Sequence, residues 1–210
     1  MVVPMATALL CAAALASATL WAAKPVYGPL HAEFAWSPAV LAVAAALSLA
    51  ITTVLLRPLD RLVMIQTGRA WACGGLTACG LTALLVLPTL THLWQFVGAL
   101  ILLGLTRAAA LLGLWRTLRL WCQRRIAALL LLAAAVLGIW PATALIGQTI
   151  YRNSWREGVA TAAGLLLLAA PLAYVLLPGR EGCAARDQPA ARGNDGAASA
   201  QTLLNEGPQQ

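Results

Sequence analysis

One arginine inside an apolar stretch is the residue best placed to do chemistry in this sequence. Arg107 lies between Trp94 and Arg116, about 13 Å from Arg116 if the stretch is helical. A charge at that depth of an apolar segment is costly and normally faces a cavity or a partner. Arg107 could therefore anchor an anionic substrate. The alternative is an arginine that extends toward a surface or bonds neighbouring carbonyls.

Residues for catalysis or metal binding are few. The only two histidines, His31 and His92, lie between apolar stretches, and none of the five cysteines forms a C-x-x-C pair. No G-x-S-x-G, H-E-x-x-H or Gly-rich phosphate-binding motif occurs, and no Asp or Glu falls inside an apolar stretch. We therefore expect no enzyme activity, no cofactor, no metal and no disulfide.

The composition indicates a membrane protein. Of the 210 residues, 61% are hydrophobic and 10% are charged, whereas soluble domains are about 45–50% apolar and about 25% charged. This excludes a soluble enzyme, a disordered chain and a fibrous repeat. The net charge of +7 would suggest nucleic acid in a soluble domain. Here the basic residues separate the apolar stretches, so we expect the lipid bilayer, and no nucleic acid, as a partner.

The apolar stretches are each long enough to cross a bilayer as a helix of about 20 residues. Because they are apolar on every face, strands of a barrel are excluded. The first has no preceding Lys or Arg, so we interpret it as a retained helix rather than a signal peptide. Six helices are therefore predicted, over residues 3–23, 38–56, 71–90, 94–115, 126–147 and 158–177.

Local signals mark helix starts, domain limits and orientation. Ser37-Pro38 and Ser154…Glu157 are typical helix N-termini, the second with the residues of a capping box. Residues 1–177 form the predicted membrane domain, and 178–210 a disordered cytoplasmic tail. Most arginines follow the second, fourth and sixth helices, which by the positive-inside rule places both termini in the cytoplasm. We expect a bacterial inner (plasma) membrane protein.

Several connecting segments resemble those of the major facilitator superfamily, in particular its monocarboxylate and oxalate/formate-antiporter-like branch. The resemblance runs in order over residues 1–177. It rests on the segments Tyr27-Gly28-Pro29-Leu30, Glu33-Phe34-Ala35-Trp36-Ser37, Pro58-Leu59, Gly68-Arg69, Leu93-Trp94-Gln95-Phe96, Trp121 with Arg124-Arg125 and Ala127, and Ser154-Trp155-Arg156.

The resemblance implies the N-terminal six-helix half of a secondary carrier, an all-α membrane protein built as a 3+3 inverted repeat. The substrate it implies is a small organic anion such as a monocarboxylate. The chain would work as a homodimer or with a separate second half. We name Arg107 and Tyr27 as candidate substrate-binding residues, and Arg61, Gly68 and Arg69 as candidate gating residues in the loop after the second helix.

Departures from the family pattern support an alternative. Aligned on Gly68, the acidic position of the gating loop is Ile65 and its first glycine position is Arg61. Family members have twelve helices, whereas six are predicted here. The alternative is a truncated, non-transporting membrane protein derived from a transporter half.

Overall fold

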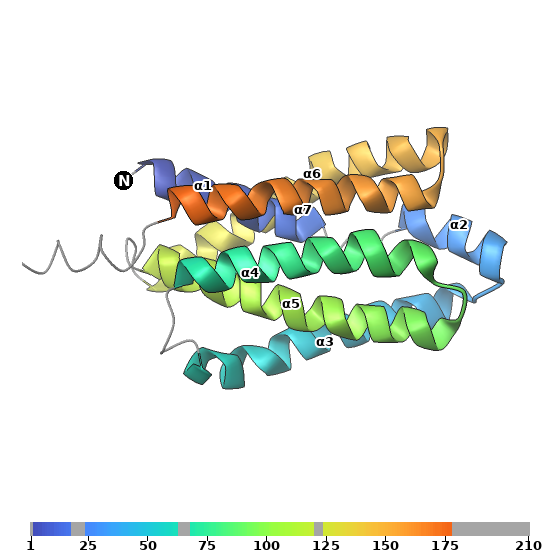
Figure 1. Ribbon diagram of the computed structural model, residues 1–210, viewed down its shortest axis with the longest axis horizontal. Coiled ribbons are helices and arrows are strands. Elements are labelled where there is room, and N and C mark those ends of the chain that lie inside the picture. The colour runs from blue at the N-terminus through green and yellow to red at the C-terminus, as the bar shows by residue number, and fades with distance from the viewer. Residues whose placement is uncertain (1, 18–23, 63–67, 120–123, 178–210) are drawn as a thin grey trace, which may run out of the picture. The chain divides into compact units, whose positions relative to one another are not determined.

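The apolar stretches form a bundle of helices in the computed structural model (Figure 1). The structure describes residues 2–17, 24–62, 68–119 and 124–177, and this part of the chain contains no strand. Its elements are α1 (Val2–Ser17), α2 (Lys24–Phe34), α3 (Pro38–Leu62), α4 (Gly68–Leu81), a π-helical turn η3 (Thr82–Val86), a 3-10 turn η4 (Leu87–Thr89), α5 (Leu93–Arg119), α6 (Arg124–Arg152) and α7 (Trp155–Leu176).

Five of these helices are long and apolar enough to cross a membrane, which confirms the membrane-protein prediction. They are α3, α5, α6, α7, and the continuous helix formed by α4 with η3 and η4. The predicted first span over 3–23 is helical over Val2–Ser17, and residues 18–23 lie outside the described part. The six-span inverted repeat therefore stays a prediction. The expected tail at 178–210 also lies outside the described residues.

Helix α2 was not predicted, because its prolines and glycine are typical of a turn. Pro25 lies in the first helical turn, where no backbone N–H needs an intrahelical partner. Pro29 lies inside the helix and removes one hydrogen bond. The helix ends at Phe34, and the next residue, Ala35, has a φ of 55°, which is in the left-handed region. Its N–H still bonds the carbonyl of His31 at 2.9 Å.

Helix starts followed the sequence signals more closely than helix ends. The Ser37 hydroxyl accepts from the Val40 N–H at 3.3 Å, and the Ser154 hydroxyl accepts from the Glu157 N–H at 3.3 Å. The second half of the expected capping box is absent, because the Glu157 carboxylate bonds the Asn153 amide instead. The predicted end at residue 56 was wrong: α3 continues through Pro58 to Leu62.

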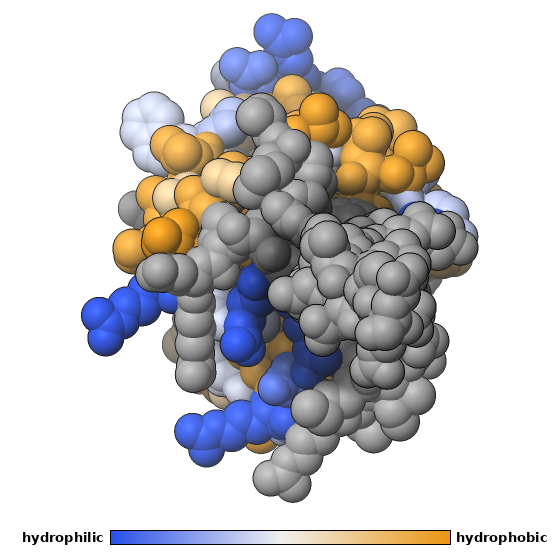
Figure 2. Space-filling view, turned by 90° about the vertical axis from the view of Figure 1, so that its left-hand side faces the viewer, coloured by the Kyte–Doolittle hydropathy of each residue, from blue (hydrophilic) through white to orange (hydrophobic). Residues whose placement is uncertain are grey.

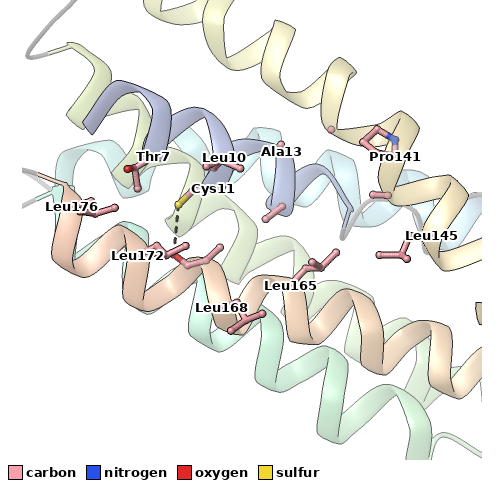
Figure 3. A pocket seen from close by; sticks show the side chains of 14 residues that line it. Thr7, Leu10, Cys11, Ala13, Pro141, Leu145, Leu165, Leu168, Leu172 and Leu176 are labelled. Carbon is pink, nitrogen blue, oxygen red and sulfur yellow. Dashed lines mark hydrogen bonds between the residues drawn. The ribbon is translucent and has the colours of Figure 1, made fainter. Parts of the chain in front are cut away.

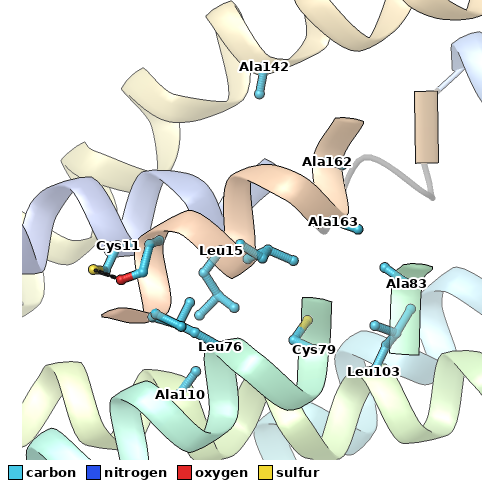
Figure 4. Close-up of a cluster of buried hydrophobic side chains, with 14 of the residues drawn as sticks. Cys11, Leu15, Leu76, Cys79, Ala83, Leu103, Ala110, Ala142, Ala162 and Ala163 are labelled. Atoms are coloured by element: carbon cyan, nitrogen blue, oxygen red, sulfur yellow. Dashed lines mark hydrogen bonds between the residues drawn. The ribbon is translucent and has the colours of Figure 1, made fainter. Parts of the chain in front are cut away.

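The centre of the bundle is the seam where α4 meets α5. A Cβ built on Gly75 of α4 would lie 2.7 Å from Ala110 Cα, and one on Gly113 of α5 would lie 2.7 Å from Ala72 Cα. Small residues thus let the two backbones touch. Figure 4 shows side chains of this core, which draws on several helices and includes Cys11, Leu15, Leu76, Cys79, Ala83, Leu103 and Ala163.

The two ends of the bundle hold different helix ends and loops. We call them the Glu33 end and the Arg116 end, after one residue at each. The Glu33 end holds α2 and the start of α7, and the Arg116 end holds the ends of α3 and α5 (Figure 1). Figure 2 looks onto the side of the Arg116 end. There, hydrophobic residues cover much of the upper part of the visible surface, and strongly hydrophilic residues lie at the top and in the lower part.

Candidate functional site

Arg107 is buried in α5 and points at two hydroxyls of α3. Only 6% of the surface of Arg107 is exposed to solvent. Its Nη2 donates to Ser48 Oγ at 2.7 Å, and its Nε donates to Thr52 Oγ1 at 3.3 Å. Neither of the two ion pairs found in the described part of the chain involves Arg107. The guanidinium, which stays protonated in proteins, is thus held by neutral acceptors alone.

A glycine brings α3 and α5 close enough for these contacts. A Cβ on Gly104 would lie 2.8 Å from the carbonyl oxygen of Ser48, so a larger residue there would push the helices apart. Thr52 Oγ1 lies 2.9 Å from the Ser48 carbonyl and 3.1 Å from the Gly104 carbonyl. Its single proton is directed to these carbonyls, which leaves its lone pairs to accept from Arg107.

Arg107 lines a cavity of about 240 Å³ between α1, α3, α5 and α6. Among the described residues, the polar ones that line it are Thr52, Thr53 and Arg107, and the Thr53 hydroxyl donates to the Ala50 carbonyl at 2.8 Å. The rest of the lining is apolar and includes Leu15, Leu49, Leu111, Leu131 and Ile139. The cavity surface is almost entirely apolar, which suits a ligand with an apolar group, and Arg107 is the charged residue beside it in the described part of the chain.

A larger cavity of about 440 Å³ lies between α1, α6 and α7 (Figure 3). Almost all its lining is Leu, Ala and other apolar residues. The Thr7 hydroxyl donates to the Val3 carbonyl at 2.9 Å, and the Cys11 thiol donates to the Ala169 carbonyl at 3.5 Å. Both polar groups are therefore already used within the protein, and the described lining of this cavity offers mainly apolar contact.

The predicted gating residues have structural contacts away from Arg107. Gly68 starts α4 against α5, where an added Cβ would lie 3.0 Å from the Gly113 carbonyl oxygen. Arg69 lies over the ring of Tyr174 in α7, with 4.0 Å from its Cζ to the ring centroid. Neither contact includes Arg107. Arg61 and Tyr27 lie in α3 and α2, and their side chains are outside the described part.

An ion pair at the Arg116 end joins the same two helices that hold Arg107. Arg116 Nη2 in α5 lies 2.8 Å from Asp60 Oδ1 and 2.7 Å from the Asp60 carbonyl oxygen in α3. The Asp60 side chain is 55% exposed, so the pair contributes little free energy of its own. It joins α3 to α5 at the Arg116 end.

A polar and aromatic cluster closes the Glu33 end. The Glu33 carboxylate accepts from Trp155 Nε1 and from Arg156 Nη1 and Nη2 at the start of α7. Arg156 Nε also donates to the Pro88 carbonyl of η4 at 3.3 Å. These hydrogen bonds hold the pKa of Glu33 below its ordinary value of 4.5, and the one from Arg156 has a larger effect than the one from Trp155. Phe34 stacks on the adjacent Trp36, with centroids 4.6 Å apart.

Sequence reasoning missed the two residues that touch Arg107. Ser48 and Thr52 are one helical turn apart on α3, and such small polar residues in an apolar helix were the only signal. It also did not pair Glu33 with Arg156. No protein-family model, no curated protein and no solved structure matches the chain.

Proposed function

We propose that the protein is a carrier half for small organic anions, monocarboxylates among them, of the kind its connecting segments resemble. The observation that supports this is Arg107, a buried charge that lines a cavity and has only hydroxyl partners. A buried charge without a counter-charge is costly. An anion in the cavity would supply the counter-charge, which supports a role in binding and carrying anions.

The cavity walls suit an organic rather than an inorganic anion. A carboxylate at the guanidinium would leave the remainder of the ligand against leucine and isoleucine side chains. Burying that apolar part contributes about 25 cal/mol per Å² of area removed from water. The same walls would disfavour a dianion, because no second basic side chain lines the cavity in the described part of the chain.

The proposal includes a second six-helix body facing the cavity. Leu49 of α3 lines the cavity and is 48% exposed, so the cavity wall at α3 continues onto the outer surface of the bundle. A second copy of this chain, or a separate half, would cover it and keep lipid from the charge. We place both termini in the cytoplasm and the protein in a bacterial inner membrane, on the distribution of arginines.

One contact favours the alternative of a non-transporting protein derived from a carrier half. Arg69, a candidate gating residue, stacks on Tyr174, and neither ion pair of the described part includes it. A cation held on an aromatic ring stabilises a packed end of the bundle. That is a structural role rather than a gating role.

The test is binding and uptake of propionate by the protein in nanodiscs and in proteoliposomes. Arg107→Gln should weaken propionate binding about 10-fold or more, since hydrogen bonds to charged groups contribute about 1.5–3 kcal/mol. Arg119→Gln is the matched control, because Arg119 is an exposed arginine of the same helix. Native mass spectrometry should show a dimer. Wild-type protein that neither binds nor transports carboxylates, or an Arg107→Gln variant equal to wild type, would overturn the proposal in favour of the alternative.

A further inference from the structure

We propose that Ser48 and Thr52 are positioning residues that select planar carboxylates over tetrahedral anions at Arg107. They would do so by occupying one edge of the guanidinium and leaving the other edge to the ligand. This inference rests on the proposed anion site at Arg107 and adds the residues that set its selectivity.

The hydroxyls of Ser48 and Thr52 accept hydrogen bonds along one edge of the planar Arg107 guanidinium. A guanidinium has five N–H donors in its plane, and Nε–H lies along the same edge as one N–H of Nη2. Thr52 Oγ1 accepts from Nε at 3.3 Å and Ser48 Oγ accepts from Nη2 at 2.7 Å. The donors that remain are the second N–H of Nη2 and both of Nη1, for which the described part of the chain supplies no acceptor.

The remaining edge of the guanidinium is complementary in shape to a carboxylate. One N–H of Nη1 and one of Nη2 run parallel at the far end of the guanidinium, a fork that matches two coplanar carboxylate oxygens. A sulfonate or phosphate presents its oxygens in a tetrahedron, so only part of its charge faces the fork. No other charged donor lines the cavity in the described part of the chain, and the Thr53 hydroxyl already bonds the Ala50 carbonyl.

The hydroxyls are themselves fixed, so they can hold the edge in place. The Thr52 proton goes to the carbonyl of Ser48 or Gly104, and Gly104 keeps α3 against α5. Without these acceptors, Nε and Nη2 would have no partner, and the guanidinium would turn to offer its Nε edge as well. Anions of other shapes would then gain hydrogen bonds, and the preference for carboxylates would fall.

The experiment compares two monoanions with the same ethyl group, propionate and ethanesulfonate, by calorimetry in nanodiscs. Wild-type protein should bind propionate about 10-fold more tightly, a difference of about 1.4 kcal/mol. Thr52→Val and Ser48→Ala should each reduce this ratio severalfold, whereas Thr52→Ser should keep it. Thr53→Val is the matched control, because Thr53 lines the same cavity without contacting Arg107.

The outcomes separate this inference from the proposed function. A ratio unchanged in both Thr52→Val and Ser48→Ala, with binding still dependent on Arg107, overturns the positioning role alone. Binding that survives Arg107→Gln overturns the proposed site as well. If Thr52→Val does not fold, Ser48→Ala compared with Thr53→Val still decides the question, because Ser48→Ala preserves the α3 backbone contact at Gly104.

Discussion

Two neighbouring glycines of α4 predict opposite responses to the same substitution. Gly75 faces α5, where an added Cβ would lie 2.7 Å from Ala110 Cα and 2.8 Å from Ala110 Cβ. A Cβ added to Gly74 would have no atom within 4 Å outside its own helix and chain neighbours. Gly75→Ala must therefore separate two helices, and Gly74→Ala need not move anything.

The magnitude follows from the difference between the two variants. Carbon atoms pack best at about 3.5–4.0 Å, so Gly75→Ala requires α4 and α5 to move apart by roughly 1 Å. Overpacking of this kind costs about 1–3 kcal/mol. Both variants gain about 1 kcal/mol of helix propensity, and this gain cancels in the comparison. Gly75→Ala should therefore be about 1–3 kcal/mol less stable than Gly74→Ala.

The assay is unfolding in mixed micelles with increasing sodium dodecyl sulfate, followed by the circular dichroism of the helices. The free energy of unfolding of each variant is compared with that of the wild type in the same micelles. Gly74→Ala should equal or exceed the wild type, and Gly75→Ala should fall below it. Equal stability of the two variants would refute the close α4–α5 contact on which the fold rests.

Two further predictions concern the Glu33 end. The pKa of Glu33 is lower in the folded protein than its ordinary value of 4.5. The ionised Glu33 carboxylate therefore stabilises the folded state fully above the ordinary pKa, and this stabilisation is lost as the pH falls through the lower pKa of the folded protein. The thermal midpoint of the wild type should thus drop in acid more than that of Glu33→Gln, and equal drops would contradict the contact with Arg156. Ala35→Gly should raise the midpoint, because glycine adopts a φ of 55° without the strain of about 1 kcal/mol that alanine has there. A lowered midpoint would contradict this.

The sequence predicted those parts of the fold that depend on local pattern. Composition and stretch length identified a helical membrane protein, and the hydroxyls of Ser37 and Ser154 marked two helix starts correctly. Helix ends were less predictable: α3 continues beyond Pro58, and its Asp60 contacts Arg116 of α5. That contact joins residues far apart in the chain, which no local pattern reveals.

The candidate site could be predicted only in part for the same reason. Arg107 was conspicuous as a charge among apolar residues, and the structure places it beside a cavity. Its partners Ser48 and Thr52 lie on another helix, and only the packing of Gly104 against α3 brings them together. Helix α2 was not predicted because its prolines and glycine are typical of a turn, although Pro29 removes only one hydrogen bond from the helix.

The contact between α3 and α5 also bears on how the chain enters the membrane during synthesis. Placing an arginine at the centre of a helix raises the insertion free energy by about 2.5–3.5 kcal/mol. Domains form from the N-terminus first as the chain is made, so α3 reaches the bilayer before α5. Ser48 and Thr52 are synthesised before Arg107, and in the folded protein they accept its hydrogen bonds. The order of the helices along the chain thus places the acceptors ahead of the charge that they bind.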